Sequence, residues 1–276
     1  MPRIIRDDGA RLEYEVRPAA GGAATASFLF QHGMGGNRQQ PLSYLGALPA
    51  TDLIAMDARG HGNSSDVLAP SRCDFGAFAD DVIALADRLE LDRFVMGGIS
   101  LGAAVALNVA IRYPDRISAL VICRPAWLDV PHVDRNRGAY AQIADLLDTH
   151  EVDEALDLFT QTPTHKEVET ESLSAAQSLR HQITRPRAAL NAEILRRFPG
   201  SSPAPDLAAW RQITAPTLVI GHTDDPFHPW AIAESTANRV PEARLVEVTS
   251  KDRDPGRFAT EIDEAIHTFL DHVTTA

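Results

Sequence analysis

The stretch that most constrains the fold of this chain is residues 95–104, which read VMGGISLGAA. An apolar run typical of a buried strand passes through Ser100 into residues typical of a helix. Glycines at positions 98 and 102 leave room for a tight turn there, because a Cβ at either position would press on the neighbouring backbone. The pattern Gly-x-Ser-x-Gly therefore predicts a sheet with a serine exposed between a strand and the amino terminus of a helix.

The rest of the chain alternates between strand and helix patterns. Apolar or alternating runs predict strands, and residues with helical spacing predict helices between them, which is typical of a doubly wound, mostly parallel α/β sheet. Strands are expected at 11–17 (an antiparallel edge), 26–31, 52–57, 94–97, 117–123, 217–221 and 244–249, and helices at 75–89, 103–112, 230–239 and 257–271.

Between residues 131 and 205 the strand patterns give way to helical spacing, at 139–147, 154–159, 172–182 and 188–198. The Pro- and Gly-rich stretch 199–205 then ends this region. The sequence therefore predicts one α/β core formed by residues 1–129 and 206–276, into which a helical cap is inserted at 130–205.

Composition excludes several classes of function. A net charge of −12 over 276 residues argues against a nucleic-acid or anionic-membrane partner. No apolar run approaches the roughly 18 residues of a membrane span, and charges at the amino terminus predict no signal peptide. With only Cys73 and Cys123, we expect no disulfide framework and a cytoplasmic protein. A homo-oligomer is compatible with the sequence.

No cofactor or metal is expected. The glycine-rich segments match neither the dinucleotide nor the P-loop pattern, and no His/Cys cluster has metal-ligand spacing. The partner predicted is a small-molecule substrate.

Four motifs in this order carry a resemblance to a known family: HGMGG at 32–36, DARGHGNS at 57–64, GISLG at 98–102 and DDPFHP at 224–229. With them the chain resembles the α/β-hydrolase superfamily, in its cap-bearing, esterase- or lipase-like branch. The resemblance implies a mostly parallel sheet of eight strands flanked by helices, with a helical cap between strands six and seven.

The resemblance also implies roles for individual residues. Ser100 resembles the family's nucleophile, and the backbone N–H groups of Leu101 and Met34 resemble its oxyanion donors. The family's acid follows strand seven in a pattern of Asp, then Pro, then Pro, which Asp225 matches; Asp224 is the alternative.

One element of the family pattern is absent. The family's general base is a histidine after strand eight, but residues 249–255 read TSKDRDP. Arg253 lies about where that histidine is expected, and a guanidinium keeps its proton at any working pH. The absence is compatible with a relocated base, for which His228, three residues after Asp225, is the best candidate.

The absent histidine is also compatible with chemistry that needs no such base. The reaction is then proton transfer, elimination or carbon–carbon cleavage without a full triad, with Arg253 and Lys251, joined by Arg124, binding an anionic substrate group. A solvated loop charge is the alternative for Arg253 and the favoured role for Lys251. Alternatively, the chain is a catalytically silent ligand-binding relative.

Two further residues are candidate substrate contacts. Trp127 has a hinge anchor as its alternative role, and His32 has a structural role in its loop as the alternative.

The sequence therefore predicts a cofactor-free serine hydrolase for a small ester, thioester, lactone or related acyl compound. The alternative is a non-hydrolytic lyase or cyclase, or a ligand-binding pseudoenzyme, of the same fold.

Overall fold

The computed structural model describes residues 1–67 and 69–274 of the chain. An eight-stranded sheet runs through it in the order β1-β2-β4-β3-β5-β6-β7-β8. Both pairings of β2 are antiparallel and all others are parallel. The strands are β1 (Arg3–Ile5), β2 (Arg11–Arg17), β3 (Ala26–Gln31), β4 (Thr51–Met56), β5 (Phe94–Ile99), β6 (Ile117–Cys123), β7 (Thr217–Gly221) and β8 (Arg244–Glu247).

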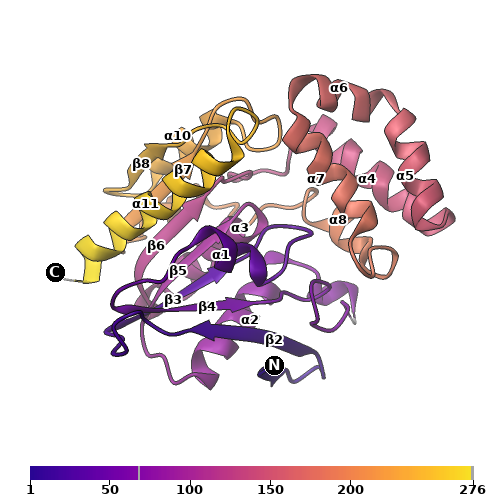
Figure 1. Cartoon of the computed structure of the whole chain (residues 1–276). Coiled ribbons are helices and arrows are strands. Elements are labelled where there is room, and N and C mark those ends of the chain that lie inside the picture. Colours follow the sequence, from indigo (N-terminus) through magenta and orange to yellow (C-terminus); the bar gives the residue numbers. More distant parts are fainter. Residues whose placement is uncertain (68, 275–276) are drawn as a thin grey trace.

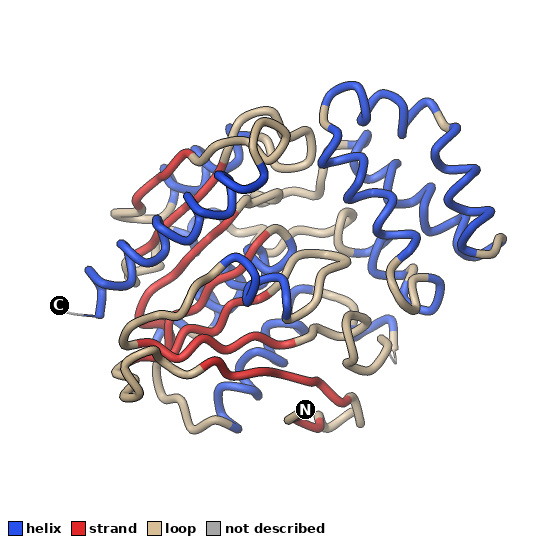
Figure 2. The backbone as a smooth tube through the Cα atoms, in the orientation of Figure 1, coloured by secondary structure: helices blue, strands red, loops and turns tan. Residues whose placement is uncertain are grey.

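Helices cover both faces of this sheet (Figures 1 and 2). Successive residues of a strand point to opposite faces, so Met96 joins the apolar cluster beneath one set of helices and Val95 the cluster beneath the other. The first set is α2 (Phe75–Arg88), α3 (Leu101–Arg112) and α10 (Trp230–Arg239); the second is α1 (Gln39–Tyr44) and α11 (Pro255–Thr274). The predicted α/β class with a mostly parallel, eight-stranded sheet is confirmed.

A helical insertion, α4 to α8, lies between β6 and β7 in the chain and beside the sheet in space (Figure 1). It has an apolar cluster of its own, which includes Ile143, Phe159 and Leu179. Its helices are α4 (Asp134–Thr149), α5 (Val152–Gln161), α6 (Pro163–Glu171), α7 (Leu173–Thr184) and α8 (Glu193–Arg197), followed by the short α9 (Leu207–Trp210).

The structure differs from the sequence prediction in several short elements. Helix α6 was not expected, because it buries only His165 and Val168; Pro163 at its first turn and the Thr162 cap begin it instead. The helix expected at 188–198 divides into a 3₁₀ turn, Ala189–Asn191, and α8. Helix α1 and strand β1 were also missed, being too short to show a period. Two further 3₁₀ turns lie at Pro70–Arg72 and Pro114–Arg116.

Cys73 and Cys123 are both buried free thiols. Among the described residues, no helix has the length and apolar character needed to cross a membrane.

Candidate active site

Ser100 stands at a strained corner between β5 and α3. Its backbone has φ 56° and ψ −115°, a conformation that a residue with a Cβ rarely adopts. The corner depends on its glycines, because a Cβ at Gly98 would lie 2.2 Å from the carbonyl of Gly102, and one at Gly102 would lie 2.1 Å from the carbonyl oxygen of Gln31. The sequence therefore holds the Ser100 hydroxyl clear of the sheet, at the amino terminus of α3.

The nearest imidazole to that hydroxyl belongs to His228. Its Nε2 lies 2.8 Å from Ser100 Oγ, and its Nδ1 lies 2.9 Å from Asp225 Oδ2. An ionised carboxylate only accepts hydrogen bonds, so Nδ1 carries the proton and Nε2 is left to accept from the serine hydroxyl. These three side chains form one hydrogen-bonded chain that can take a proton from Ser100.

A single loop, between β7 and α10, supplies both Asp225 and His228. Oδ1 of Asp225 accepts from the backbone N–H groups of Phe227 (3.0 Å) and His228 (3.1 Å), which folds the loop around the carboxylate. Asp224, with φ 64°, turns the chain just before it. The two side chains are therefore brought together by a local turn, and no residue from the segment after β8 is needed.

Arg124, at the end of β6, completes the surroundings of the acid. Its Nη2 donates to Asp225 Oδ2, and the same nitrogen lies 3.1 Å from Nδ1 of His228. Because Nδ1 of His228 carries a proton, its contact with the arginine nitrogen is not a hydrogen bond. The two nitrogens lie close together because both donate to Oδ2 of Asp225. The guanidinium is thus held by Asp225 while it also lines the cavity over Ser100, and the substrate contact expected of Arg124 stays a prediction.

These contacts set the protonation states of the site. Burial would raise the pKa of Asp225, but the neighbouring His228 and Arg124 outweigh it and hold that pKa well below its usual range. Burial lowers the pKa of His228, and the positive charge of Arg124 lowers it further, against the opposing effect of Asp225. His228 is therefore neutral at neutral pH, which a proton acceptor must be.

Two backbone N–H groups lie near Ser100 without an acceptor among the described residues: those of Leu101, the first residue of α3, and of Met34. The loop that carries Met34 is held by three contacts, one with α1 and two with α7. Gly33 N donates to Gln40 Oε1 (2.7 Å), and in α7 Gln182 Nε2 donates to the Met34 carbonyl (3.0 Å) while His181 Nε2 contacts that of Gly35 (3.1 Å).

A small cavity, with about 80 Å³ of free interior volume, lies over these groups. Helix α7 and the loop after β8 close it. Its lining residues are Gly33, Met34, Gln40, Tyr44, Ile99, Ser100, Arg124, Tyr140, Ser174, Ala175, Ser178, Leu179, Asp225, Phe227, His228 and Lys251. The sequence prediction weighed Lys251 as an anion-binding residue but favoured a solvated loop charge, whereas the structure places it in the cavity lining; its position in the loop after β8, where the family keeps its histidine, was the available signal.

The structure places three predicted substrate contacts away from this cavity. His32 is fully buried, with Nδ1 donating to the Gly33 carbonyl (2.8 Å) and Nε2 accepting from Ala58 N (3.0 Å), so both nitrogens serve the loops. Trp127 is buried against Phe75, and its indole N–H donates to the Phe198 carbonyl. Both are structural anchors.

Arg253 is the third. Its side chain is 73% exposed and lies 3.5 Å from Asp224, the alternative acid, which is itself half exposed. Neither residue lines the cavity, so the structure supports neither an anion-binding role for Arg253 nor a triad role for Asp224.

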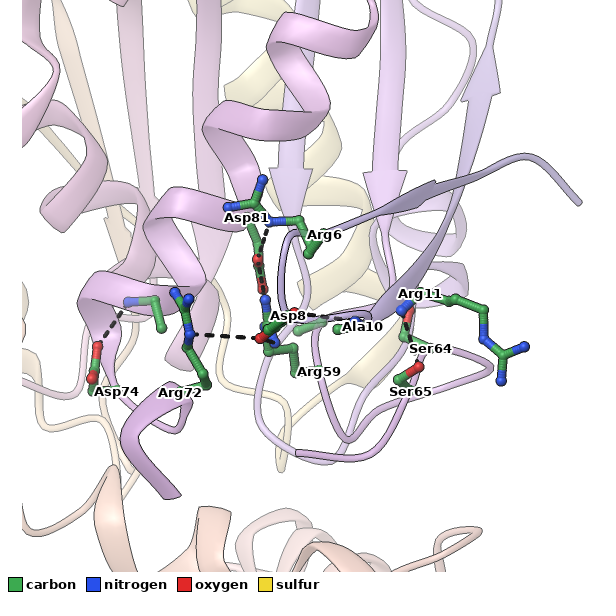
Figure 3. Close-up of polar contacts among 12 residues, drawn as sticks. Arg6, Asp8, Ala10, Arg11, Arg59, Ser64, Ser65, Arg72, Asp74 and Asp81 are labelled. Atoms are coloured by element: carbon green, nitrogen blue, oxygen red, sulfur yellow. Dashed lines mark hydrogen bonds and ion pairs between the residues drawn. The ribbon is translucent and has the colours of Figure 1, made fainter. Parts of the chain in front are cut away.

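The motif at 57–64 contains an Asp, an Arg and a His, but their side chains make structural hydrogen bonds outside the cavity. Arg59 donates to both oxygens of Asp81, at 2.5 and 2.8 Å, and also to Asp8. Figure 3 shows this cluster, in which Arg6 also donates to Asp81. The network fixes the amino-terminal segment against α2. No group of His, Cys, Asp and Glu side chains that could hold a metal occurs among the residues described.

The chain is similar to known proteins in both sequence and fold. A family profile described as "alpha/beta hydrolase fold" matches residues 26–252. A putative carbamate hydrolase, RutD, of Rhizobium rhizogenes is 28% identical over 222 residues, covering 79% of this chain and 82% of that protein. A putative 2-succinyl-6-hydroxy-2,4-cyclohexadiene-1-carboxylate synthase of Bacillus subtilis is 32% identical, over 43% of this chain and 42% of its own. The crystal structure of the enol-lactonase from Burkholderia xenovorans LB400 superposes with a TM-score of 0.69 at 21% identity, covering all of both chains.

Proposed function

The chain belongs to the alpha/beta hydrolase fold family, and from that premise we propose that it is a serine hydrolase for a small ester, thioester, lactone or related acyl substrate. The observation that carries the proposal is the hydrogen-bonded chain from Ser100 Oγ through His228 to Asp225. A fold alone hosts many chemistries, so the activity is argued from these three side chains.

In the proposed reaction Ser100 Oγ attacks the carbonyl carbon of the substrate while Nε2 of His228 takes the hydroxyl proton. The imidazolium then returns that proton to the leaving group, and water, activated by the same nitrogen, hydrolyses the acyl-enzyme. Asp225 holds the imidazole in the Nδ1–H tautomer throughout. His228 thus takes the role that the family gives to a histidine after strand eight.

The negative charge that develops on the carbonyl oxygen needs donors already in place. We propose that the free N–H groups of Leu101 and Met34 supply them, with the amino terminus of α3 behind Leu101. A preorganised donor of this kind is worth about 2.7–4 kcal/mol of barrier lowering. The contacts of Gln182 and His181 with the Met34 loop support a cap role for the helical insertion, since they couple α7 to these donors.

A second candidate is proton transfer or carbon–carbon bond chemistry at the same three side chains. It is favoured by the similarity of part of the chain to the putative synthase of Bacillus subtilis. That candidate predicts turnover that depends on His228 but produces no acyl-enzyme on Ser100.

The test is labelling by a fluorophosphonate probe, followed by ester and lactone hydrolysis with the same protein. We expect stoichiometric labelling of the wild type and none of Ser100→Ala. Ser43→Ala, which removes an exposed serine of α1, is the matched control and should label as the wild type does. Labelling that survives in Ser100→Ala would contradict the proposal.

A further inference from the structure

Lys251 is an unpaired cation in the candidate active site. Its half-buried side chain lines the same cavity as Ser100 and His228. Among the described residues, no hydrogen-bond acceptor and no carboxylate within ion-pair distance contacts its ammonium group. Burying a charge is costly unless it is paired, so a bound anion would stabilise this unpaired lysine.

The nearest acid in sequence, Asp252, is already committed elsewhere. Its Oδ1 accepts from Ser174 N (2.7 Å), and its Oδ2 accepts from the hydroxyls of Ser172 (2.5 Å) and Ser174 (3.2 Å). These bonds cap the amino terminus of α7 and fix the loop after β8 against it. The loop is thereby held in place while Lys251 is left facing the cavity.

The charges that line the cavity do not balance. They are the carboxylate of Asp225 and the cations Arg124 and Lys251, with His228 neutral. Arg124 is ion-paired with Asp225, so Lys251 supplies one uncompensated positive charge. Burial lowers the pKa of Lys251, and the positive charge of Arg124 lowers it further, against the opposing effects of Asp225 and Asp252. Both of those carboxylates already have closer partners, Arg124 for Asp225 and the α7 serines for Asp252.

We propose that Lys251 binds a carboxylate carried by the substrate, at a distance from the acyl carbon that Ser100 attacks. Ser178, from α7, lines the same cavity, and its hydroxyl has no hydrogen-bond partner among the described residues, so it can donate to that carboxylate as well. The substrate class is therefore acyl compounds with a second, anionic carboxylate. This inference rests on the proposed function, because it assigns the other end of the substrate of the same site.

The contrast with Arg253 supports this assignment. Both cations belong to the loop after β8, but Arg253 is turned to solvent beside Asp224. Arg253 is therefore the matched control, a cation of the same loop that lies outside the cavity.

The experiment compares two 4-nitrophenyl esters of equal chain length, the glutaric monoester and the pentanoate, which differ in a terminal carboxylate against a methyl group. The quantity measured is kcat/KM for the glutaric monoester divided by kcat/KM for the pentanoate. A charge-assisted hydrogen bond predicts that Lys251→Met lowers this ratio about tenfold to a hundredfold, in favour of the pentanoate. Lys251→Arg should retain most of the preference, and Arg253→Met should leave the ratio at its wild-type value.

An unchanged ratio in Lys251→Met would overturn the proposal, as would an equal loss in Arg253→Met. If neither ester is hydrolysed in a Ser100-dependent way, the proposed function fails, and the carboxylate site is then decided by binding. Calorimetric titration of Ser100→Ala with glutarate should give saturable binding that is lost in Ser100→Ala/Lys251→Met. Equal titrations of the two proteins, or none in either, would overturn the carboxylate site itself.

Discussion

Two clusters of buried charge follow strands of the same sheet, and they are built differently. The Arg59 cluster, after β4, consists of Arg6, Arg59, Asp8 and Asp81, so that two arginines meet two carboxylates. The pocket cluster, around Arg124 after β6, consists of Arg124, Lys251, Asp225 and the neutral His228. In the first cluster each cation has a carboxylate partner; in the second, one cation has none.

This difference separates a structural network from a site. In the Arg59 cluster burial would lower the pKa of Arg59, but Asp81 and Asp8 outweigh it and raise that pKa. Burial raises the pKa of Asp81, and Arg59 and Arg6 oppose that increase, so each cation is matched by a carboxylate. In the pocket cluster Arg124 instead lowers the pKa of His228. A neutral imidazole and an unpaired ammonium do not stabilise each other, but each can interact with a bound substrate. Ionisable groups with perturbed pKa values are typical of functional sites.

The largest effect is expected at Ser100. If the pocket cluster is catalytic, Ser100→Ala should reduce kcat for an ester substrate by about 10⁴–10⁶-fold, because removing a nucleophile disables the whole triad. Unfolding by urea should leave the midpoint close to that of the wild type. A residual rate within tenfold of the wild type would show that the serine is not the nucleophile.

Asp225→Asn is expected to have the next largest effect. The amide cannot hold His228 in the Nδ1–H tautomer as a carboxylate does, and kcat should fall about 10³–10⁴-fold. The matched change Asp224→Asn, at the exposed neighbour, should leave kcat within about twofold, since its side chain does not face His228. Comparable losses in both variants would contradict the assignment of the acid.

The Arg59 cluster should respond in stability instead. Asp81→Asn leaves Arg59 buried with a weakened partner set, and breaking a buried ion pair costs about 3–5 kcal/mol in the free energy of unfolding. Chemical denaturation measures this loss, while kcat per active site, counted by fluorophosphonate titration, should stay within about twofold. A large loss of kcat per labelled site would mean that this cluster is not purely structural.

A smaller effect, on pH dependence, is expected from Arg124→Met. Burial and the Arg124 charge both lower the pKa of His228, and His228 must be neutral to accept a proton. Removing the guanidinium removes one of these effects, so the pKa of His228 rises. The acid limb of the kcat/KM profile should therefore move to higher pH. An unchanged limb, or one that moves to lower pH, would contradict this coupling.

The smallest effect is expected for Arg253→Ala. The side chain is exposed beside Asp224, and an exposed ion pair contributes about 0–1 kcal/mol. Steady-state kinetics should give kcat and KM within about twofold of the wild type for neutral and anionic esters alike. A tenfold or greater loss of kcat/KM would show that Arg253 contributes to the site and would favour the non-hydrolytic alternative.

Much of the fold could be predicted from the sequence because its signals are local. The apolar strand before Ser100, and the glycines that a Cβ would disrupt, predict the corner that the structure has at 98–102. The short elements were missed for the opposite reason: β1 and α1 are defined by tertiary contacts, and their few residues carry no period.

The site was harder to predict, because side-chain direction within a loop is not local. The sequence offered His228 as a candidate for the base, yet only the turn around the Asp225 carboxylate explains how the imidazole spans from the acid to the serine. Lys251 and Arg253 are two residues apart with the same charge. Which one faces the cavity depends on the bonds that Asp252 makes with α7, and no pattern in the sequence encodes those.

The central claim is that His228, from the loop after β7, acts as the base for Ser100. The most direct measurement is the rate constant for fluorophosphonate labelling of the wild type and of His228→Gln, with Ser100→Ala as the blank. Loss of a general base predicts that His228→Gln labels about 10²–10⁴-fold more slowly. Labelling of His228→Gln at a rate within a few-fold of the wild type would contradict the claim.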